Sequence, residues 1–216
     1  MATITSQLID ISHTRRRLWK VLVSKVESFF GALLFRRSPT SQRRLLNLGC
    51  GVTRFEGFVN ADFYRFTDII RRKSNLPDWM LDAGKDWKCS EGFWEGIYTE
   101  HTLEHLDYSE VIVCLKECFR TLRPGAWLRI ILPGLKTTLQ SSSLSFNAIT
   151  VGALTQTHGH LSVWDGDLLC SLLREIGFIE VNEVVFKEGR DQRLLVDLEE
   201  RKLGSFYVEA MKPAKK

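Results

Sequence analysis

The sequence predicts an α/β protein with a mostly parallel sheet and helices on both of its faces. Short apolar runs that end at glycine or proline alternate along the chain with segments of helical periodicity. Such alternation is typical of β-α-β units, whose crossovers lay helices over a parallel sheet. The first run, Leu45, Leu46 and Leu48, stops at a glycine and suits a strand buried on both faces.

Length and charge divide the chain into a short basic segment, residues 1–44, and one main domain, residues 45–216. A chain of 216 residues with 44% hydrophobic content can fill one sizeable core. The first segment holds nine Lys/Arg against two acids, a balance of +7, so the main domain carries −3 of the total of +4. Because nucleic-acid binding needs a basic face, this balance argues against a nucleic-acid substrate.

The five cysteines form no CxxC pair and no disulfide spacing, which indicates a reducing cytoplasm. Cys114 and Cys118 are four residues apart on an expected helix. That spacing fits two core positions, and it also fits two ligands of a shared metal.

Residues 13–37 have the pattern of a basic amphipathic helix, with apolar residues at helical spacing and arginines at both ends. Charges interrupt the segment too often for a membrane span, and its pattern does not fit a secretory signal. Three interpretations stay open: attachment to an anionic membrane, packing on the domain or on a partner, and an organelle transit peptide. Ser38-Pro39-Thr40-Ser41 reads as the hinge into the main domain.

A glycine turn and a second strand follow the first strand. Gly49-Cys50-Gly51 allows positive φ and lets a ligand lie against the backbone. Val59-Asn60-Ala61-Asp62 then reads as a strand that ends in a carboxylate. Such an acid can accept hydrogen bonds from both hydroxyls of a ribose. The alternatives are an ordinary turn and a surface cap.

The rest of the domain continues the alternation of helix and strand. Ser109 is expected to cap one helix, and Asp165 and Gly177 are expected to bound another. Residues 136–157, rich in Ser and Thr, read as a loop or cover. The expected helices are residues 66–72, 109–122 and 165–176, and the expected strands are residues 94–99, 127–132, 178–186 and 206–211.

The ordered set LLNLGCG, VNADF, Asp82, EGIYTEHTLEHL, ECFRTLRPGAWLRIILPGL and REIGF resembles the class I methyltransferases that depend on S-adenosylmethionine (SAM). It looks closest to a small bacterial type, similar to methyltransferase type 11 and often associated with glycan and cell-surface biosynthesis. The resemblance runs from about residue 45 to residue 211. It implies a Rossmann-like seven-stranded sheet of order 3-2-1-4-5-7-6 with one antiparallel strand, and SAM across the carboxyl ends of its strands.

The resemblance also implies a set of cofactor contacts. The glycine turn would pass beneath the methionine part and the ribose of SAM, and Asp62 would hold the ribose hydroxyls. Asp82 matches the acid near the adenine amino group, and residues 98–101 would lie beside the sulfonium. The implied cofactor-binding residues are Asn47, Gly49, Cys50, Gly51, Asp62, Phe63, Leu81, Asp82, Ala83, Tyr98, Thr99, Glu100 and His101.

The sequence departs from the family pattern at several positions. Asn47 and Thr53 stand where many relatives have an acid and a third glycine, and Ala126 replaces the second glycine of a Pro-Gly-Gly turn. Asn47 lacks the charge that would attract the ammonium of SAM, and charged hydrogen bonds contribute about 1.5–3 kcal/mol. Only ten residues separate Gly51 from Asp62, so the usual first helix must be short.

Four histidines form two clusters, His101 with His105 and His158 with His160. An imidazole titrates near neutrality, so these four are the candidates for the base that takes the acceptor's proton, with His101 and His160 leading. The alternative is that they shape the pocket through hydrogen bonds to loop carbonyls.

Glu104 stands between the first two of these histidines, and the spacing of His101, Glu104 and His105 places three ligand types on one face of a helix. Some related methyltransferases bind a divalent metal through Glu-x-x-Glu-His, which aligns here. A histidine in first place makes such a site softer and less suited to magnesium. Other relatives use the Glu-His pair as a structural turn, with the glutamate bound to backbone amides. We assign no metal from the sequence.

Two functions follow from the resemblance. The first is methyl transfer from SAM to an acceptor, expected to be a hydroxyl of a small molecule or glycan precursor, in the cytoplasm at or near the inner membrane face. The second is a SAM-binding regulatory or partner subunit without its own catalysis. The acceptor and the oligomeric state stay open.

Overall fold

The computed structural model describes residues 3–6, 8–9, 42–63, 76–137 and 159–214. The amphipathic segment 13–37, the hinge at Ser38–Ser41, the helix expected at residues 66–72, His158 and most of the loop at residues 136–157 lie outside these residues. The division into residues 1–44 and 45–216 therefore stays a prediction.

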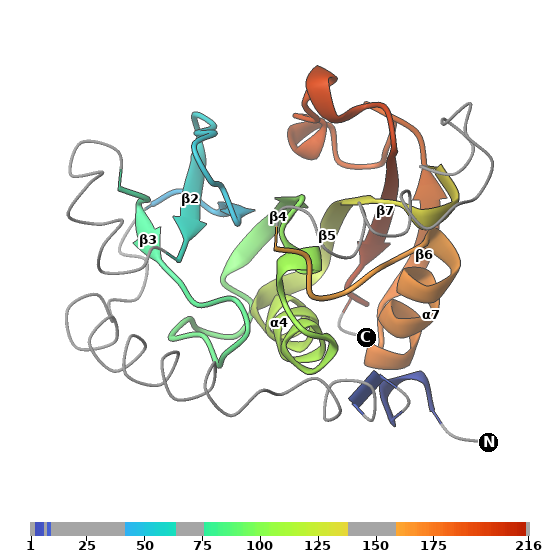
Figure 1. The fold of residues 1–216 in the computed structure, drawn as a ribbon. Coiled ribbons are helices and arrows are strands. Elements are labelled where there is room, and N and C mark those ends of the chain that lie inside the picture. Colours follow the sequence, from blue (N-terminus) through green and yellow to red (C-terminus); the bar gives the residue numbers. More distant parts are fainter. Residues whose placement is uncertain (1–2, 7, 10–41, 64–75, 138–158, 215–216) are drawn as a thin grey trace.

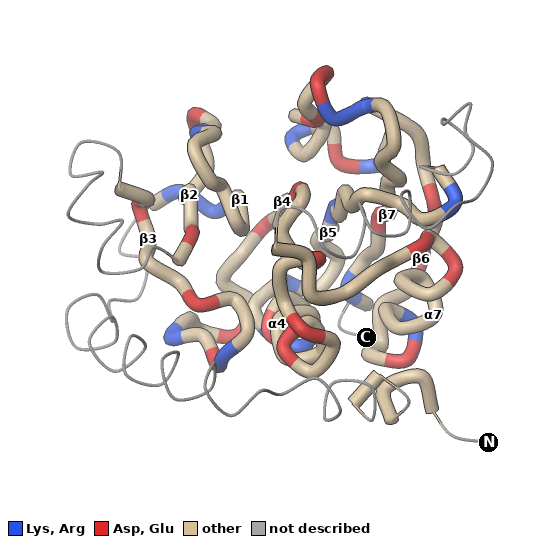
Figure 2. The backbone as a smooth tube through the Cα atoms, viewed as in Figure 1, with Lys and Arg blue, Asp and Glu red and all other residues tan. Residues whose placement is uncertain are grey.

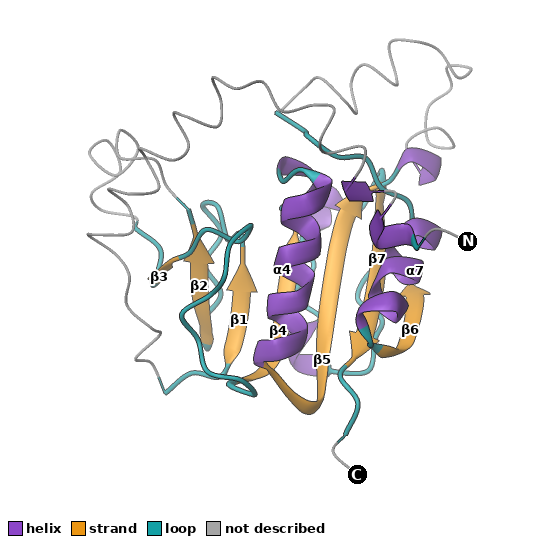
Figure 3. Ribbon diagram, turned by 90° about the horizontal axis from the view of Figure 1, so that it is seen from below, coloured by secondary structure: helices purple, strands orange, loops and turns teal. Residues whose placement is uncertain are grey.

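A seven-stranded sheet forms the centre of the molecule (Figures 1 and 3). Its order is β3-β2-β1-β4-β5-β7-β6, and β7 runs antiparallel to both of its neighbours while the other pairs are parallel. The predicted fold and strand order are thus confirmed. The strands are β1 (Leu45–Leu48), β2 (Phe58–Asp62), β3 (Trp79–Met80), β4 (Trp94–Glu100), β5 (Leu122–Pro133), β6 (Ile179–Val184) and β7 (Ser205–Met211).

Two α-helices, α4 (Tyr108–Thr121) and α7 (Gly166–Ile176), lie on one face of the sheet (Figure 3). A large apolar cluster joins them to inward-pointing strand residues such as Ile97 and Ile130. On the opposite face, a smaller cluster gathers Tyr98, Ile131 and Leu194. Successive strand residues therefore enter different clusters, as the two-residue period of a pleated strand requires. Among the described residues, only the 3-10 helices η2 (Gln192–Leu194) and η3 (Glu199–Arg201) follow β6 on the way to β7.

The helix boundaries confirm one sequence prediction and correct another. Asp165 caps α7 by accepting from the amide of Leu168, and Gly177 ends the helix at a φ of 117°. In contrast, Asp107 rather than Ser109 caps α4, since its carboxylate accepts from Glu110 N in a capping box. The Ser109 hydroxyl instead donates to Asp107. Both residue types suit an N-cap, so spacing alone did not separate them.

Other expected elements differ at their ends. The strand expected at residues 178–186 stops at Val184, where the chain leaves the sheet for the segment 185–204. The link between β1 and β2, residues 49–57, consists of turns. The first helix, which was expected to be short, is therefore absent from this link. No helix within the described residues is long and apolar enough to cross a membrane.

The segment 185–204 forms a wall beside the sheet and carries closely spaced charges of both signs (Figure 2). We call it the β6–β7 segment. A buried ion pair ties it to β5: Arg129 Nη2 lies 2.5 Å from Asp197 Oδ2, and the side chains are 2% and 0% exposed. Arg129 also donates to the carbonyls of Glu188 and Val185, and Asp197 accepts from Lys187 N. Both charged groups of the pair are therefore hydrogen-bonded, and these bonds offset the free-energy cost of removing the charges from water.

We expect Asp197→Ala to lower the free energy of unfolding by about 3–5 kcal/mol, because it leaves the Arg129 guanidinium buried and unpaired. Urea denaturation measures this. The matched control is Arg123→Ala, which breaks the half-exposed pair with Glu95 and is expected to cost less than about 1 kcal/mol. Equal losses in the two variants would contradict the assigned importance of the buried pair.

Candidate cofactor-binding site

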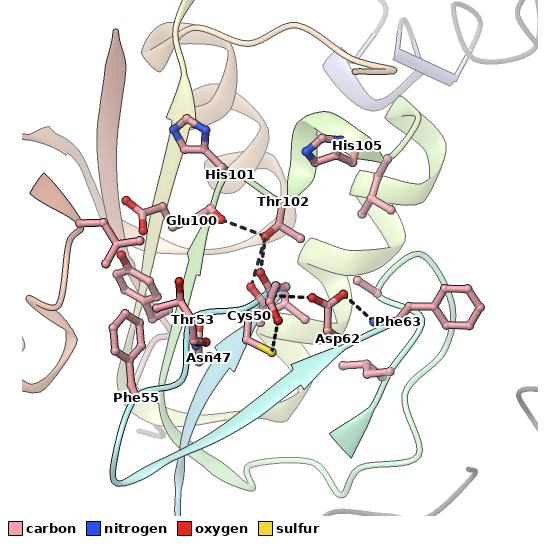
Figure 4. A pocket seen from close by; sticks show the side chains of 18 of the residues that line it. Asn47, Cys50, Thr53, Phe55, Asp62, Phe63, Glu100, His101, Thr102 and His105 are labelled. Carbon is pink, nitrogen blue, oxygen red and sulfur yellow. Dashed lines mark hydrogen bonds between the residues drawn. The ribbon is translucent and has the colours of Figure 1, made fainter. Parts of the chain in front are cut away.

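A cavity of about 370 Å³ opens at the carboxyl ends of β1, β2 and β4 (Figure 4). In an open α/β sheet this edge is the usual place for a ligand, because the connecting loops diverge there. Of the residues predicted to bind cofactor, those that line the cavity are Asn47, Gly49, Cys50, Gly51, Asp62, Phe63, Leu81, Asp82, Ala83, Tyr98, Glu100 and His101. Their roles toward a ligand stay predictions.

The glycine turn after β1 is held against β2 by its backbone. The amides of Gly49 and Cys50 both donate to the carbonyl of Ala61, at 2.8 and 3.0 Å. Gly49 and Gly51 have φ of 71° and 53°, a region that side chains disfavour. A Cβ on Gly49 would also lie 2.0 Å from Thr102 Oγ1, whereas one on Gly51 would meet nothing within 4 Å. Close packing therefore requires glycine at position 49 in particular.

The Asp62 carboxylate is fixed at the end of β2. Its Oδ2 accepts from Gly51 N and its Oδ1 from Phe63 N, each at 2.6 Å. Figure 4 shows the side chain between the turn and the start of the next loop. Because two backbone amides orient the carboxylate, it presents a preorganised anionic acceptor at the cavity wall.

Asp82 lines the cavity beyond Asp62. Its Oδ1 accepts from Gly84 N, and its Oδ2 lies 2.6 Å from Lys85 Nζ. This carboxylate is half-exposed and already paired, so a ligand amino group would share it with Lys85.

Asn47 is buried and belongs to a polar network beneath the cavity. Its amide donates to Asn60 Oδ1 at 2.9 Å and to the carbonyl of Thr53 at 3.3 Å. Asn60 in turn donates to Asp78. Burial alone would raise the pKa of Asp78, but these hydrogen bonds and Arg43 outweigh it, so the pKa is lowered. The network thus holds the Asn47 side chain through its NH2 group, which donates both hydrogen bonds. An ionised acid at this position has no such donor.

The end of β4 contributes Tyr98 and Glu100 to the cavity, but not Thr99. Thr99 was among the predicted cofactor contacts. Its side chain is buried on the other side of the strand, because alternate residues of a strand face opposite ways. Burial raises the pKa values of both Tyr98 and Glu100, and within the described residues Glu100 Oε1 accepts no hydrogen bond. Glu100 thus adds a third carboxyl group to the cavity lining, beside Asp62 and Asp82.

His101 and His105 line the cavity, and His160 lies behind them. Burial is the largest of the causes that lower the pKa of His101 to about 4, and electrostatic interactions with Arg201, His160 and His105 add to it. This side chain is therefore neutral at pH 7, with Nε2 2.8 Å from Ser205 Oγ. His160 does not line the cavity but packs edge-on against His105, with ring centroids 5.1 Å apart.

Sequence reasoning missed several residues of the cavity wall. Thr102 closes it above Gly49, and Leu198 and Arg201 approach from the β6–β7 segment. Arg201 Nη1 donates to the carbonyl of Glu100 at 3.3 Å, which holds the segment against the end of β4. No local motif marks these two residues, since they are about 100 positions away from β4. The missed lining residues are Leu48, Thr53, Phe55, Thr102, Leu106, Leu198 and Arg201.

Sheet order, antiparallel β7 and a glycine turn facing an acid at the end of β2 can now be compared with known structures. The fold is that of SAM-dependent methyltransferases. A SAM-dependent methyltransferase from Archaeoglobus fulgidus matches with a TM-score of 0.57 and 20% identity, over 88% of this chain and 93% of the other. Neither a protein-family model nor a curated protein matches the sequence.

Two other solved methyltransferases share this fold, and one of them contains the cofactor. The Haemonchus contortus phosphoethanolamine N-methyltransferase 2, in complex with SAM, matches with a TM-score of 0.53 and 12% identity, over 79% of this chain. This chain spans about half, 49%, of that enzyme's length. A Thermotoga maritima methyltransferase, described as a possible histamine N-methyltransferase, matches with a TM-score of 0.51 and 16% identity, over 80% and 83% of the two chains. These similarities establish the methyltransferase fold.

Two glycine variants test the turn of this methyltransferase fold. We expect Gly51→Ala to cost about 1–2 kcal/mol of stability, the strain of a side chain at positive φ. Gly49→Ala is expected to cost a further ~1–3 kcal/mol, because its Cβ would displace Thr102. Urea denaturation of both variants gives the comparison, and a Gly49→Ala protein as stable as Gly51→Ala would show that Thr102 does not constrain the turn.

Proposed function

We propose that this protein transfers a methyl group from SAM to a hydroxyl of a small molecule or glycan precursor. The observation that carries the proposal is the Asp62 carboxylate, held by Gly51 N and Phe63 N at the wall of the cavity. A carboxylate oriented in this way can accept from both hydroxyls of a ribose. The adjoining Gly49–Gly51 backbone leaves room for the rest of the cofactor.

The charge of the cavity also suits SAM. The sequence lacks an acid at Asn47, but Glu100 supplies a carboxylate at the end of the neighbouring strand. We assign to Glu100 the ammonium group of SAM, since its Oε1 is buried and accepts no hydrogen bond from any described residue. Asp82, together with Lys85, is assigned to the adenine end.

The histidine side of the cavity suits the acceptor. In methyl transfer the acceptor oxygen attacks in line, the bond from sulfur to the methyl carbon breaks, and the acceptor's proton passes to a base. We assign that role to His101, whose imidazole lines the cavity and is unprotonated at pH 7, although its lowered pKa makes it a weaker base than a free imidazole. Arg201 beside it supplies a cation that would hold an anionic part of the acceptor.

The finer parts of the proposal rest on the sequence. The basic amphipathic pattern of residues 13–37 supports attachment to an anionic membrane, where glycan precursors are assembled. A small-molecule acceptor is also in keeping with the Haemonchus enzyme, which has been solved with phosphomonomethylethanolamine and S-adenosylhomocysteine. Flotation with anionic vesicles, with and without residues 1–37, tests the membrane part.

The alternative is a SAM-binding regulatory or partner subunit. The pairing of Asp82 with Lys85 and the engagement of the Asn47 amide within the protein favour it, since both reduce the contacts offered to a cofactor. Tight binding of SAM and its demethylated product without turnover on any acceptor would support this second function.

We expect Asp62→Ala to weaken SAM and S-adenosylhomocysteine binding about 100-fold, because two charge-assisted hydrogen bonds together contribute roughly 3 kcal/mol. Isothermal titration measures both ligands. Asp62→Asn separates ligand contact from support of the turn, since the amide oxygen still accepts from one backbone amide. Asp86→Asn, at an exposed position, is the matched control and should keep wild-type affinity.

Two outcomes would count against the proposal. If the wild-type protein bound neither ligand at millimolar concentration, both proposed functions would be wrong. If Asp62→Ala bound as tightly as wild type while remaining folded by circular dichroism, the assignment of Asp62 to the ribose would be wrong.

A further inference from the structure

Three side chains that can ligate a metal meet beside the cavity. In the part of the chain that the structure describes, Glu104, His105 and His160 have ligand atoms that all lie within 4.8 Å of one another. The first two belong to the 3-10 helix η1 (Leu103–His105), and the third comes from a segment more than fifty residues later. Their convergence is therefore a product of the tertiary fold and not of local spacing.

Backbone and side-chain hydrogen bonds fix the distant segment against η1. The amides of Leu161 and Ser162 both donate to the carbonyl of Glu104, at 2.7 and 3.1 Å. The Ser162 hydroxyl donates to the carbonyl of Leu103 and accepts from Trp164 Nε1. These contacts fix the two residues that follow His160, and they thereby keep the backbone of His160 beside His105.

The Glu104 carboxylate provides the observation that points to a ligand. The residue is 1% exposed, and neither of its oxygens has a hydrogen-bond partner among the described residues. The sequence interpretation in which Glu104 binds backbone amides is therefore not what this structure shows. The groups near the carboxylate are imidazoles: Glu104 Oε1 lies 3.8 Å from His105 Nε2 and 3.6 Å from His101 Nδ1. A buried carboxylate without hydrogen bonds is costly unless a proton neutralises it or a cation compensates it.

We propose that Glu104, His105 and His160 form a site for a divalent transition-metal cation at the edge of the cavity. Two imidazoles and one carboxylate suit Zn²⁺, Co²⁺, Ni²⁺ or Fe²⁺ better than Mg²⁺, which prefers oxygen ligands. Ligand atoms around tetrahedral zinc lie ~3.3 Å apart, so the observed separations require only small side-chain rotations. The site itself rests on this cluster alone and does not depend on SAM binding, whereas the role of its cation rests on the proposed function.

The position of the cluster suggests what the cation does. Three protein ligands leave a coordination position open, as in sites where a metal contacts a substrate. His105 belongs to the cluster and also lines the cavity beside His101, so a bound cation would lie within reach of the cavity. A cation there would coordinate an acceptor oxygen and lower the pKa of an acceptor hydroxyl.

The test is titration of tag-free, chelator-treated protein with Co²⁺, followed by its visible d–d absorption. We expect saturation at one equivalent, without the intense ultraviolet absorption of cobalt bound to thiolate, since all five cysteines are buried and none belongs to the cluster. Competition with Zn²⁺ should displace the cobalt, and Mg²⁺ in large excess should not. Absence of saturable binding, or a thiolate spectrum, would overturn the proposal.

Variants locate the site. His160→Ala and Glu104→Gln are each expected to weaken Co²⁺ binding at least tenfold, and His160→Cys should restore binding with a thiolate band that wild type lacks. Glu91→Gln, which removes an exposed carboxylate from outside the cluster, is the matched control and should bind as wild type does. Circular dichroism and SAM titration on the same samples report folding and the proposed function separately. Wild-type Co²⁺ affinity in both His160→Ala and Glu104→Gln would place the metal elsewhere and overturn the proposal.

Discussion

The candidate site depends on one constraint, the attachment of the turn after β1 to the end of β2. Two amides of the turn share the Ala61 carbonyl, and a third donates to the Asp62 carboxylate. The turn therefore cannot move without releasing the acid, and the acid cannot rotate without losing the turn. With no helix between the two strands, this contact does the positioning that a longer crossover would otherwise do.

The part of the site that sequence could predict is the part made by consecutive residues. Glycines after an apolar run and an acid at the end of the next strand can be placed from the sequence, because parallel strands end at a common edge of the sheet. Thr99 was predicted together with its neighbours in a stretch of four residues, but its side chain does not line the cavity, because strand geometry turns every second side chain away. Leu198 and Arg201 carry no local signal, since their approach depends on the pair between Arg129 and Asp197 deep in the fold.

The histidines show the same division. The sequence placed His101, Glu104 and His105 together by spacing, and the structure adds His160 through backbone contacts that no periodicity encodes. It also separates the roles of these residues: His101 lines the cavity as a neutral imidazole, while His160 stands behind His105. His101 Nδ1 and His105 Nε2 both approach Glu104 Oε1, so this carboxylate connects the imidazoles that line the cavity with the proposed metal cluster.

The β6–β7 segment has a consequence for how such a protein diversifies. Its attachment to the sheet uses Arg129 and Asp197, whereas its contribution to the cavity comes from Leu198 and Arg201. The buried anchor and the cavity wall are therefore largely separate side chains of one segment, and Arg201 serves in both through its bond to the Glu100 carbonyl. Leu198 takes no part in the buried pair, so a substitution there can reshape this wall of the cavity while the ion pair, the sheet and the glycine turn keep their contacts.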